Sequence, residues 1–337
     1  MADFDYDAFT PRIAVVGVGG QGSNLVNRLC ANNMKSAVTM AMNTDISHLN
    51  MIKADKKLLL GKEITQGLGA GGFPEVAAKC ADASRGEIEQ MLQGYDLVFI
   101  AAGMGGGTGT GAAPIVAKVA REIGATVIAT VTYPFNLERS RKTKAEWGIN
   151  QLSGQADSVI VIENDKLLSY VPNLPIERAF ELVDNITGNA VKGIADTITL
   201  PSLINLDFAD LRNVVRNTGT AVISIGSGYG SGRVEQAIKS TRTHPLLTVD
   251  YDGAKGALVH VVGGSNLTIS EATEIGNGVT QDLAPDANVI FGARLAPELN
   301  DQLRVMCVVT GVKAKFGEKR TDSGSTPLRM ENVEHLY

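Results

Sequence analysis

The sequence contains few cysteines, and their spacing argues against two common kinds of site. Cysteine occurs three times in 337 residues, at Cys30, Cys80 and Cys307, and no CxxC pair is present. Isolated cysteines of this kind are typical of reduced thiols in a cytoplasm rather than of a disulfide framework or a zinc site. The 4 histidines show no metal-ligand spacing either. We therefore expect no metal ion held by protein side chains.

Long hydrophobic runs and an excess of basic charge are also missing. No apolar run approaches the roughly 20 residues that cross a bilayer, and the acidic N-terminus, MADFDYDAFTPR, lacks the order of a secretory signal. The net charge of −5 gives no general affinity for nucleic acid or for anionic membranes. With 44% apolar residues the chain can bury sizeable cores, and its length favours two domains. These features predict a cytoplasmic protein without membrane insertion or nucleic-acid binding.

One glycine-rich stretch, Gly103–Gly111, organises the rest of the chain. It reads GMGGGTGTG, and it lacks the lysine that a Walker motif needs. Glycines let a backbone approach a ligand closely, and a helix start supplies free N–H groups and a positive partial charge. Thr108 and Thr110 add hydroxyl donors. The stretch predicts a phosphate-binding loop rather than an ordinary turn, and we expect Gly107 and Gly109 to tolerate no side chain, because a Cβ would enter the phosphate site or require a positive φ.

Strand and helix patterns alternate through the first half of the chain. The predicted strands cover 12–18, 37–42, 56–61, 95–102, 125–132 and 158–162. The predicted helices cover 23–31, 75–81, 85–93, 112–123 and about 137–152. Glycine-rich loops follow three of the strands. The alternation predicts an α/β fold with a doubly wound, mostly parallel sheet, in which these loops meet at the carboxyl ends of the strands.

The first glycine loop is also compatible with a protein of a different class. Gly17, Gly19 and Gly22 have the spacing of a dinucleotide fingerprint. Asp45 follows 28 residues after Gly17, somewhat late for the acid that binds a ribose. An NAD-dependent Rossmann oxidoreductase is therefore the alternative, and it predicts affinity for NAD.

The second half of the chain opens with a long amphipathic helix. Apolar residues recur every three or four positions from Ile176 to Ile198, between Pro175 and Pro201. Further patterns predict helices at 208–216, 231–240 and 270–283 and strands at 220–227, 256–262, 288–293 and 304–310. These elements no longer alternate strictly, which predicts a smaller domain with a mixed sheet. The predicted divisions are a flexible arm at 1–11, a nucleotide-binding domain at 12–175, a central helix at 176–200, a second domain at 201–315, and a disordered linker with a terminal peptide at 316–337.

Phe180 and Asp184 could recognise a purine base. They are four residues apart and so share one face of the long helix. An aromatic ring can stack on a purine, and a carboxylate can accept two hydrogen bonds from guanine but not from adenine. A core phenylalanine and a solvated aspartate are the commoner outcome for such residues. The glycine loops favour the interpretation as a guanine site.

Asn205, Asp207 and Asp210 form an acidic segment after the long helix. The first interpretation is a helix start, with Asp207 as the N-cap and Asp210 complementing the helix dipole. The nucleotide-binding half offers no general base, however, so these residues are also candidates for catalysis.

The order GGGTGTG at 105–111 resembles the signature of the tubulin/FtsZ superfamily, in its FtsZ spelling. Six further motifs occur in the order of that family: GVGGQGSN at 17–24, GLGAGG at 67–72, PFNLE at 134–138, ENDKLL at 163–168, AFELVDNI at 179–186 and NLDFADLR at 205–212. The resemblance covers residues 10–312, and the spelling favours an archaeal source.

The resemblance implies a Rossmann-like GTPase domain, a central helix and a smaller α+β activation domain. It implies a cytoskeletal GTPase that binds GTP and GDP, with Mg²⁺ held mainly through the phosphates. It also implies head-to-tail polymerisation, hydrolysis at a site shared between subunits, and a role in cell division at a midcell ring. The partners would be other copies of the chain and a membrane tether or division protein bound by the C-terminal peptide at 328–337. A tubulin-like filament protein for cell shape is a further alternative.

The resemblance also implies roles for residues at matching positions. The residues implied to bind nucleotide are Gly19, Gly20, Gln21, Gly22, Asn24, Ala70, Gly71, Gly72, Gly103, Gly105, Gly106, Gly107, Thr108, Gly109, Thr110, Pro134, Glu138, Arg141, Asn164, Phe180 and Asp184. Asn205, Asp207 and Asp210 are implied to act on the nucleotide of a neighbouring subunit.

The sequence departs from the family pattern at two places. Gln21 and Ser23 stand where the family often has glycine, so a side chain could narrow the first phosphate loop. The stretch between Glu138 and Trp147 is one residue short, so the family arginine falls on Arg141 or is replaced by Lys142. Counting back from Gly148 favours Arg141.

Overall fold

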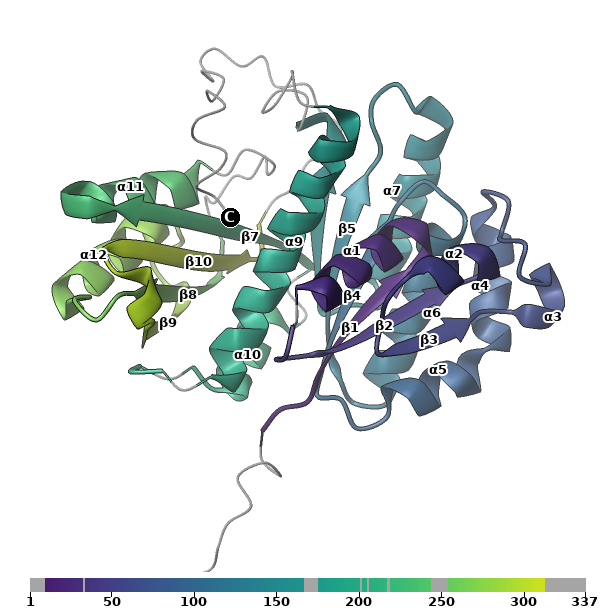
Figure 1. Cartoon of the computed structure of the whole chain (residues 1–337), viewed down its shortest axis with the longest axis horizontal. Coiled ribbons are helices and arrows are strands. Elements are labelled where there is room, and N and C mark those ends of the chain that lie inside the picture. Colours follow the sequence, from purple (N-terminus) through teal and green to yellow (C-terminus); the bar gives the residue numbers. More distant parts are fainter. Residues whose placement is uncertain are drawn as a thin grey trace, which may run out of the picture.

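The strands of the described residues form one continuous sheet of ten strands, whose two portions, here called the first and the second sheet, flank a long helix (Figure 1). The computed structural model describes residues 10–32, 34–166, 175–200, 202–204, 206–216, 219–243 and 254–312. Most of the arm predicted at 1–11 and all of the segment predicted at 316–337 lie outside these residues.

The first sheet has six parallel strands. They are β1 (Ile13–Val18), β2 (Val38–Asn43), β3 (Lys56–Leu59), β4 (Leu97–Gly103), β5 (Thr126–Tyr133) and β6 (Ser158–Glu163). Their order is β3-β2-β1-β4-β5-β6, which confirms the doubly wound prediction. The order reverses at β1, so the loops after β1 and β4 flank the switch point where such sheets bind ligands. Dinucleotide enzymes share this order, so topology alone leaves the oxidoreductase alternative open.

Seven helices are described between the strands of this sheet. They are α1 (Gly19–Ala31), α2 (Ile46–Met51), α3 (Lys62–Thr65), α4 (Pro74–Ala83), α5 (Arg85–Leu92), α6 (Thr108–Glu122) and α7 (Arg139–Ser153). The predictions placed the starts of α1 and α6 at Ser23 and Ala112, which is wrong, because both helices begin inside the glycine motifs. The sequence patterns also missed α2 and α3. Both are short, so neither shows a helical hydrophobic period.

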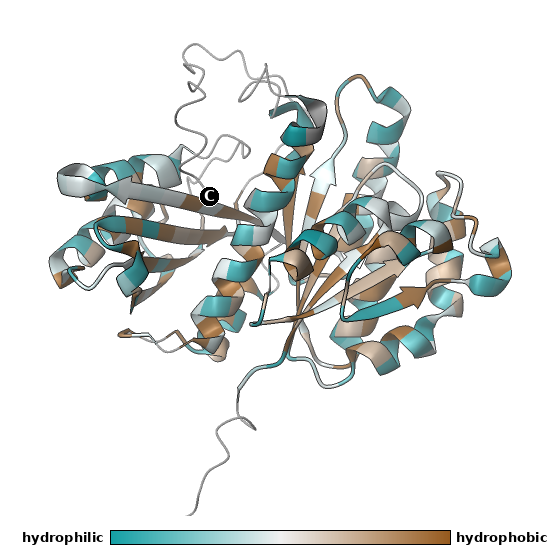
Figure 2. Cartoon of the chain, in the orientation of Figure 1, coloured by the Kyte–Doolittle hydropathy of each residue, from teal (hydrophilic) through white to brown (hydrophobic). Residues whose placement is uncertain are grey.

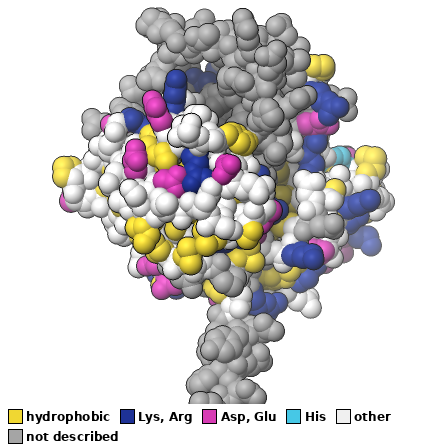
Figure 3. Space-filling view, turned by 60° about the vertical axis from the view of Figure 1, so that its left-hand side comes forward, with side chains coloured by type: hydrophobic (Ala, Val, Ile, Leu, Met, Phe, Trp, Pro, Cys, Tyr) yellow, Lys and Arg dark blue, Asp and Glu magenta, His cyan; other side chains and the backbone are white. Residues whose placement is uncertain are grey.

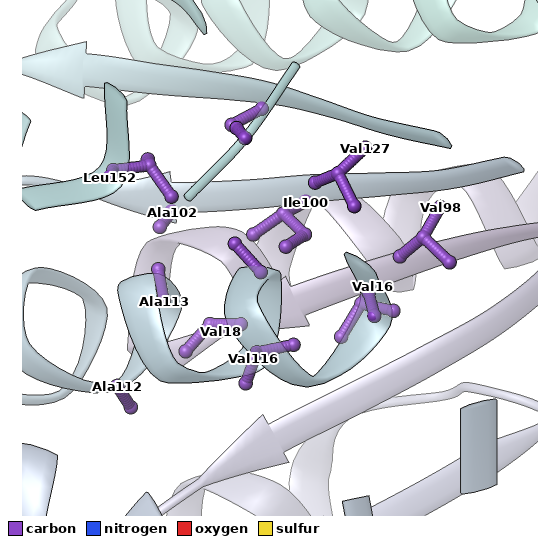
Figure 4. Close-up of a cluster of buried hydrophobic side chains, with 14 of the residues drawn as sticks. Val16, Val18, Val98, Ile100, Ala102, Ala112, Ala113, Val116, Val127 and Leu152 are labelled. Carbon is purple, nitrogen blue, oxygen red and sulfur yellow. The ribbon is translucent and has the colours of Figure 1, made fainter. Parts of the chain in front are cut away.

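Alternate residues of the parallel strands face two different cores. Val16, Val18, Val98 and Ile100 are buried against α6, where Ala112, Ala113 and Val116 meet them (Figure 4). The residues between them, such as Val15 and Phe99, face the other side, where α1 and the long helix pack. The strands therefore read as continuous apolar runs because both faces are covered. Figure 2 shows the same arrangement: the strands are mostly hydrophobic (brown), and the helices around them have both hydrophobic and hydrophilic (teal) residues.

The second half begins with α9 (Ile176–Thr199), the helix predicted at 176–200. The second sheet contains β7 (Gly219–Tyr229), β8 (Gly256–Gly263), β9 (Asn288–Leu295) and β10 (Gln302–Thr310). The helices α10 (Phe208–Val215), α11 (Arg233–Arg242) and α12 (Ile269–Thr280) pack on it. Strand β10 is antiparallel to β7 and β8, whereas β9 is parallel to β8, which confirms the mixed sheet.

One core joins the two halves across α9. Ala190, Val191 and Ile194 of α9 are buried in the same cluster as Phe99 of the first sheet and Met306 of the second. The first and second sheets also touch directly, since Ser158 and Val159 of β6 pair with the start of β7. The face drawn in Figure 3 shows acidic and basic side chains interspersed with hydrophobic ones over the second half. No helix within the described ranges is long and apolar enough to span a membrane.

Candidate nucleotide site

Two glycine loops meet directly at the switch point of the sheet. Gly19, which follows β1 and has a φ of +74°, lies so close to the start of α6 that an added Cβ would be 2.7 Å from the Gly109 amide nitrogen. The backbone of the first loop therefore fits against the signature loop only because this position is glycine. The hydroxyl oxygens of Thr44, after β2, and Thr108, in the first turn of α6, are 2.8 Å apart. The ends of β1, β2 and β4 thus converge, and the glycine loops after β1 and β4 meet as predicted.

The signature loop is folded by its own threonine. Thr110 is fully buried, and its hydroxyl accepts a hydrogen bond of 2.9 Å from the Gly105 amide. This bond holds the loop over the start of α6, where the first amides of the helix have no partner within the helix. The Thr110 hydroxyl thus supports the loop, whereas the Thr108 hydroxyl faces Thr44. Free amides and the positive end of the helix dipole make this turn suited to an anion.

The third glycine loop, Gly67–Gly72, packs on the same turn. A Cβ added to Gly107 would lie 3.0 Å from the Cβ of Ala70 and 3.2 Å from the Gly72 amide nitrogen. Gly107 itself has a φ of −82°, so of the two expected reasons a positive φ does not apply, and an added Cβ would instead be tightly packed against the neighbouring loop. The Nζ of Lys144 on α7 donates a 2.7 Å hydrogen bond to the Gly72 carbonyl and lies over the Phe73 ring. Helix α7 therefore holds this loop in place.

The two departures from the family pattern have defined positions. The Gln21 side chain folds against Gly103, where an added Cβ would lie 2.2 Å from its Oε1. Arg141 donates a 3.4 Å hydrogen bond from Nε to the Gly105 carbonyl and forms an ion pair with Glu138. Lys142 instead bonds the Asn136 side chain at 2.7 Å. Of the two candidates, only Arg141 contacts the signature loop.

The residues expected to hold the base lie at one end of α9. The rings of Phe180 and Phe135 meet edge to face with centroids 5.9 Å apart, just after the buried Pro134. The side chain of Asn164 is buried, and its Oδ1 has no hydrogen-bond partner among the described residues. Asn24 lies exposed on α1. An unpaired buried amide oxygen is costly, so its presence is consistent with a ligand donor at this place.

Asp184 is paired in a way that sequence reasoning missed. Its Oδ2 accepts a 2.9 Å hydrogen bond from the Nε of Arg28 on α1. Burial raises the pKa of Asp184 to about 6, although Arg28 opposes this effect. Arg28, Thr44 and Lys144 were not among the predicted site residues. The only available signal for Arg28 was its position four residues after Asn24 on the same helix.

The acidic segment lies at the other end of α9. The Asp207 side chain caps α10 by accepting a 2.7 Å hydrogen bond from the Asp210 amide, and the Asp210 side chain accepts in return from the Asp207 amide at 3.4 Å. This capping box confirms the predicted helix start. A backbone bridge between Ile204 and Ala293 of β9 and the burial of Leu206 fix the segment. Asn205 lies outside the described residues.

The fold and the site define a nucleotide-binding protein of the doubly wound α/β class, with glycine loops in place of a Walker motif. The GTPase domain of the tubulin/FtsZ family matches residues 12–172, and the C-terminal domain of the FtsZ family matches residues 219–313. The chain belongs to this family and is a GTPase of the FtsZ type.

Individual relatives agree with this assignment. The chain is 53% identical to "Cell division protein FtsZ 2" of Methanocaldococcus jannaschii over 90% of this chain and 80% of that protein. It is 49% identical to the protein of the same name from Haloferax volcanii, over 93% and 78% of the two chains. Among solved structures, an empty FtsZ dimer from M. jannaschii superposes with a TM-score of 0.85 at 42% identity, covering 95% of this chain and 97% of that one. These matches favour GTP over NAD as the ligand of the glycine loops.

Proposed function

We propose that this chain hydrolyses GTP at a site shared between neighbouring subunits of a head-to-tail filament, and that the filament acts in cell division at a midcell ring. The proposal rests most on one observation: the guanine candidates and the acidic segment lie at opposite ends of α9. The helix has 24 residues and ends at Thr199, and the stretch from Asp184 to that end spans about 22 Å at 1.5 Å per residue. On this proposal the acids act on the γ-phosphate of the next subunit rather than on that of their own chain.

Each half of the shared site supplies what the other lacks. The glycine amides, Thr108 and Arg141 bind and neutralise phosphate charge, and Mg²⁺ would be held through the phosphates, where it stabilises the charge that develops on the leaving group. The carboxylates of Asp207 and Asp210 accept hydrogen bonds from an attacking water. Head-to-tail stacking brings the two halves together through a heterologous contact, which couples hydrolysis to assembly.

The proposed division of labour follows the two halves. Residues 12–175 would bind the nucleotide, the helix at 176–200 would connect the halves, and residues 201–315 would present the acids to the next subunit. The matched domains at 12–172 and 219–313 support this division. Recruitment to a membrane tether or a division protein would be the task of the C-terminal peptide at 328–337, which lies outside the described residues.

The decisive experiment measures phosphate release per subunit against protein concentration, together with light scattering, in the presence of GTP and Mg²⁺. Specific activity should rise steeply at the concentration where scattering appears. A constant specific activity down to concentrations without polymer would contradict the shared site. A titration with GTP and NAD separates this function from the oxidoreductase, which would bind only NAD. Fluorescent tagging in cells separates division from cell shape, because a division protein should form a midcell ring.

A further inference from the structure

Arg28 joins α1 to the residue expected to read the base. Its Nε lies 2.9 Å from Oδ2 of Asp184, and its Nη1 lies 3.6 Å from Oε1 of Glu181. The Asp184 residue is only 9% exposed, whereas about a third of the Arg28 side chain remains accessible. The hydrogen bond from Arg28 is made to Oδ2 of Asp184. The carboxylate is therefore held from one side by a fixed cation and keeps acceptor capacity for a ligand.

The charge of Asp184 is finely balanced. Burial raises its pKa, Arg28 lowers it and the charge of Glu181 on the same helix raises it, and together these effects bring the pKa to about 6. Glu181 is itself paired with Arg178 at 2.8 Å. Among the side chains that the structure describes, Arg28 and Glu181 are the charged groups that act on this carboxylate. Only the ionised carboxylate accepts both hydrogen bonds from the N1–H and the exocyclic amine of guanine, because a protonated acid turns one acceptor into a donor.

We propose that Arg28 is a positioning residue for guanine recognition, which keeps Asp184 ionised and oriented so that GTP binds at neutral pH. This inference rests on the proposed function, because it assumes that Asp184 contacts guanine. It adds a role for a residue on a different helix and a pH dependence of the guanine site. If Arg28 only tied α1 to α9, its removal would affect stability and binding equally at every pH.

The test compares the affinity for a fluorescent GTP analogue from pH 5 to pH 8 in four proteins: wild type, Arg28→Met, Arg28→Lys and Lys53→Met. Lys53 is an exposed residue of the nucleotide-binding half. Its replacement therefore removes one positive charge from that half and leaves the ion pair of Asp184 in place. Below about pH 6 the wild-type affinity should fall, approaching tenfold per pH unit. In Arg28→Met this fall should begin above pH 7, with a loss of tenfold or more at pH 7 that is regained towards pH 8. Arg28→Lys and Lys53→Met should follow the wild type.

One further variant and the contrary outcomes complete the test. Asp184→Asn should bind weakly with no pH dependence between pH 5 and pH 8, because the titrating group is gone. If Arg28→Met does not fold, as judged by its thermal unfolding, Arg28→Gln replaces it in the same comparison. A loss that is equal at all pH values, or no loss, would overturn the role of Arg28 while leaving GTP binding intact. Failure of the wild type to bind GTP at any pH would instead overturn the proposed function, and this inference with it.

Discussion

The hydroxyl of Thr197, on α9, lies 2.9 Å from Nδ1 of His260, on β8. The histidine is buried, and its Nε2 has no partner among the described residues. Burial lowers the pKa of His260 to about 4, and the positive charge of Arg294 acts in the same direction. A neutral imidazole therefore connects the helix between the two halves to the second sheet.

This contact predicts a specific loss of stability in acid. The folded-state pKa of His260 lies below its unfolded value of about 6.5, so the unfolded chain binds the proton more readily. The contribution is fully present above pH 6.5 and is lost as the pH falls towards 4, by a total on the order of 3 kcal/mol. Urea unfolding of wild type and His260→Asn between pH 4 and pH 8 measures it. The stability difference between the two proteins should change with pH over this window, and parallel curves would contradict the prediction.

Alanine at Gly109 should abolish GTP binding and reduce stability. A Cβ at this position would lie 2.4 Å from the Gly103 carbonyl oxygen, so the signature loop must shift. Overpacking of this kind costs about 1–3 kcal/mol. Gly107→Ala should have a milder effect, because the added Cβ would lie 3.0 Å from its nearest neighbour, the Ala70 methyl group. Thermal unfolding and GTP titration measure both effects.

Gly86→Ala is the matched control for the glycine variants. Gly86 is exposed in α5, and an added Cβ meets nothing within 4 Å. This variant should bind GTP normally and gain up to about 1 kcal/mol of stability from its helix propensity. A Gly109→Ala protein that matches it in both measurements would show that the loop is not closely packed.

Replacing Asp184 should relax the choice of base. Asp184→Ala removes the acceptor of two hydrogen bonds from guanine, and GTP affinity should fall roughly tenfold or more. ATP binding should change little, because adenine lacks that donor pair. Competition titrations with both nucleotides measure the ratio. Retention of wild-type GTP affinity together with rejection of ATP would mean that another residue reads the base.

The acids after α9 need variants that separate capping from catalysis, because Asp207 and Asp210 hold the start of α10. Asn is as good an N-cap as Asp, so Asp207→Asn should keep the helix stable, whereas Asp207→Ala should cost about 1 kcal/mol. In the Asp210→Asn variant, the side-chain amide oxygen can still accept a hydrogen bond from the backbone N–H of Asp207. Both Asn variants should bind GTP and assemble, yet lose turnover on the order of a hundredfold or more.

Mixing provides the control for that prediction. An Asp210→Asn subunit keeps its nucleotide loops, and a Gly109→Ala subunit keeps its acids, so co-assembly should restore part of the turnover that each lacks alone. Phosphate release and sedimentation measure turnover and assembly together. Normal turnover by both Asn variants would exclude ionised carboxylates from the reaction.

Local sequence patterns predicted the strands and the longer helices, but not the two short helices α2 and α3 and not every helix start. The apolar run at 95–102 predicted β4 well, since a strand covered on both faces has no polar positions. The glycines of the next motif were assigned to a loop, yet α6 begins at Thr108 within it. Glycine is a poor helix former, so its propensity argued against a helix there, and packing of the loop against β4 and the Gly67–Gly72 loop overrode it.

The sequence by itself determined the succession of strands and glycine loops along the chain, the mixed second sheet, and the helix start at Asp207 and Asp210. These features follow from periodicity, from turn residues and from capping, all of which act between near neighbours in the chain. Only the tertiary structure decided which residues meet across the sheet. Arg28 and Asp184 are separated by 156 positions, and their contact depends on how α1 packs against α9. The same is true of Lys144 and Gly72, because the position of a side chain on a neighbouring helix is set by packing of the whole core, which no local pattern records.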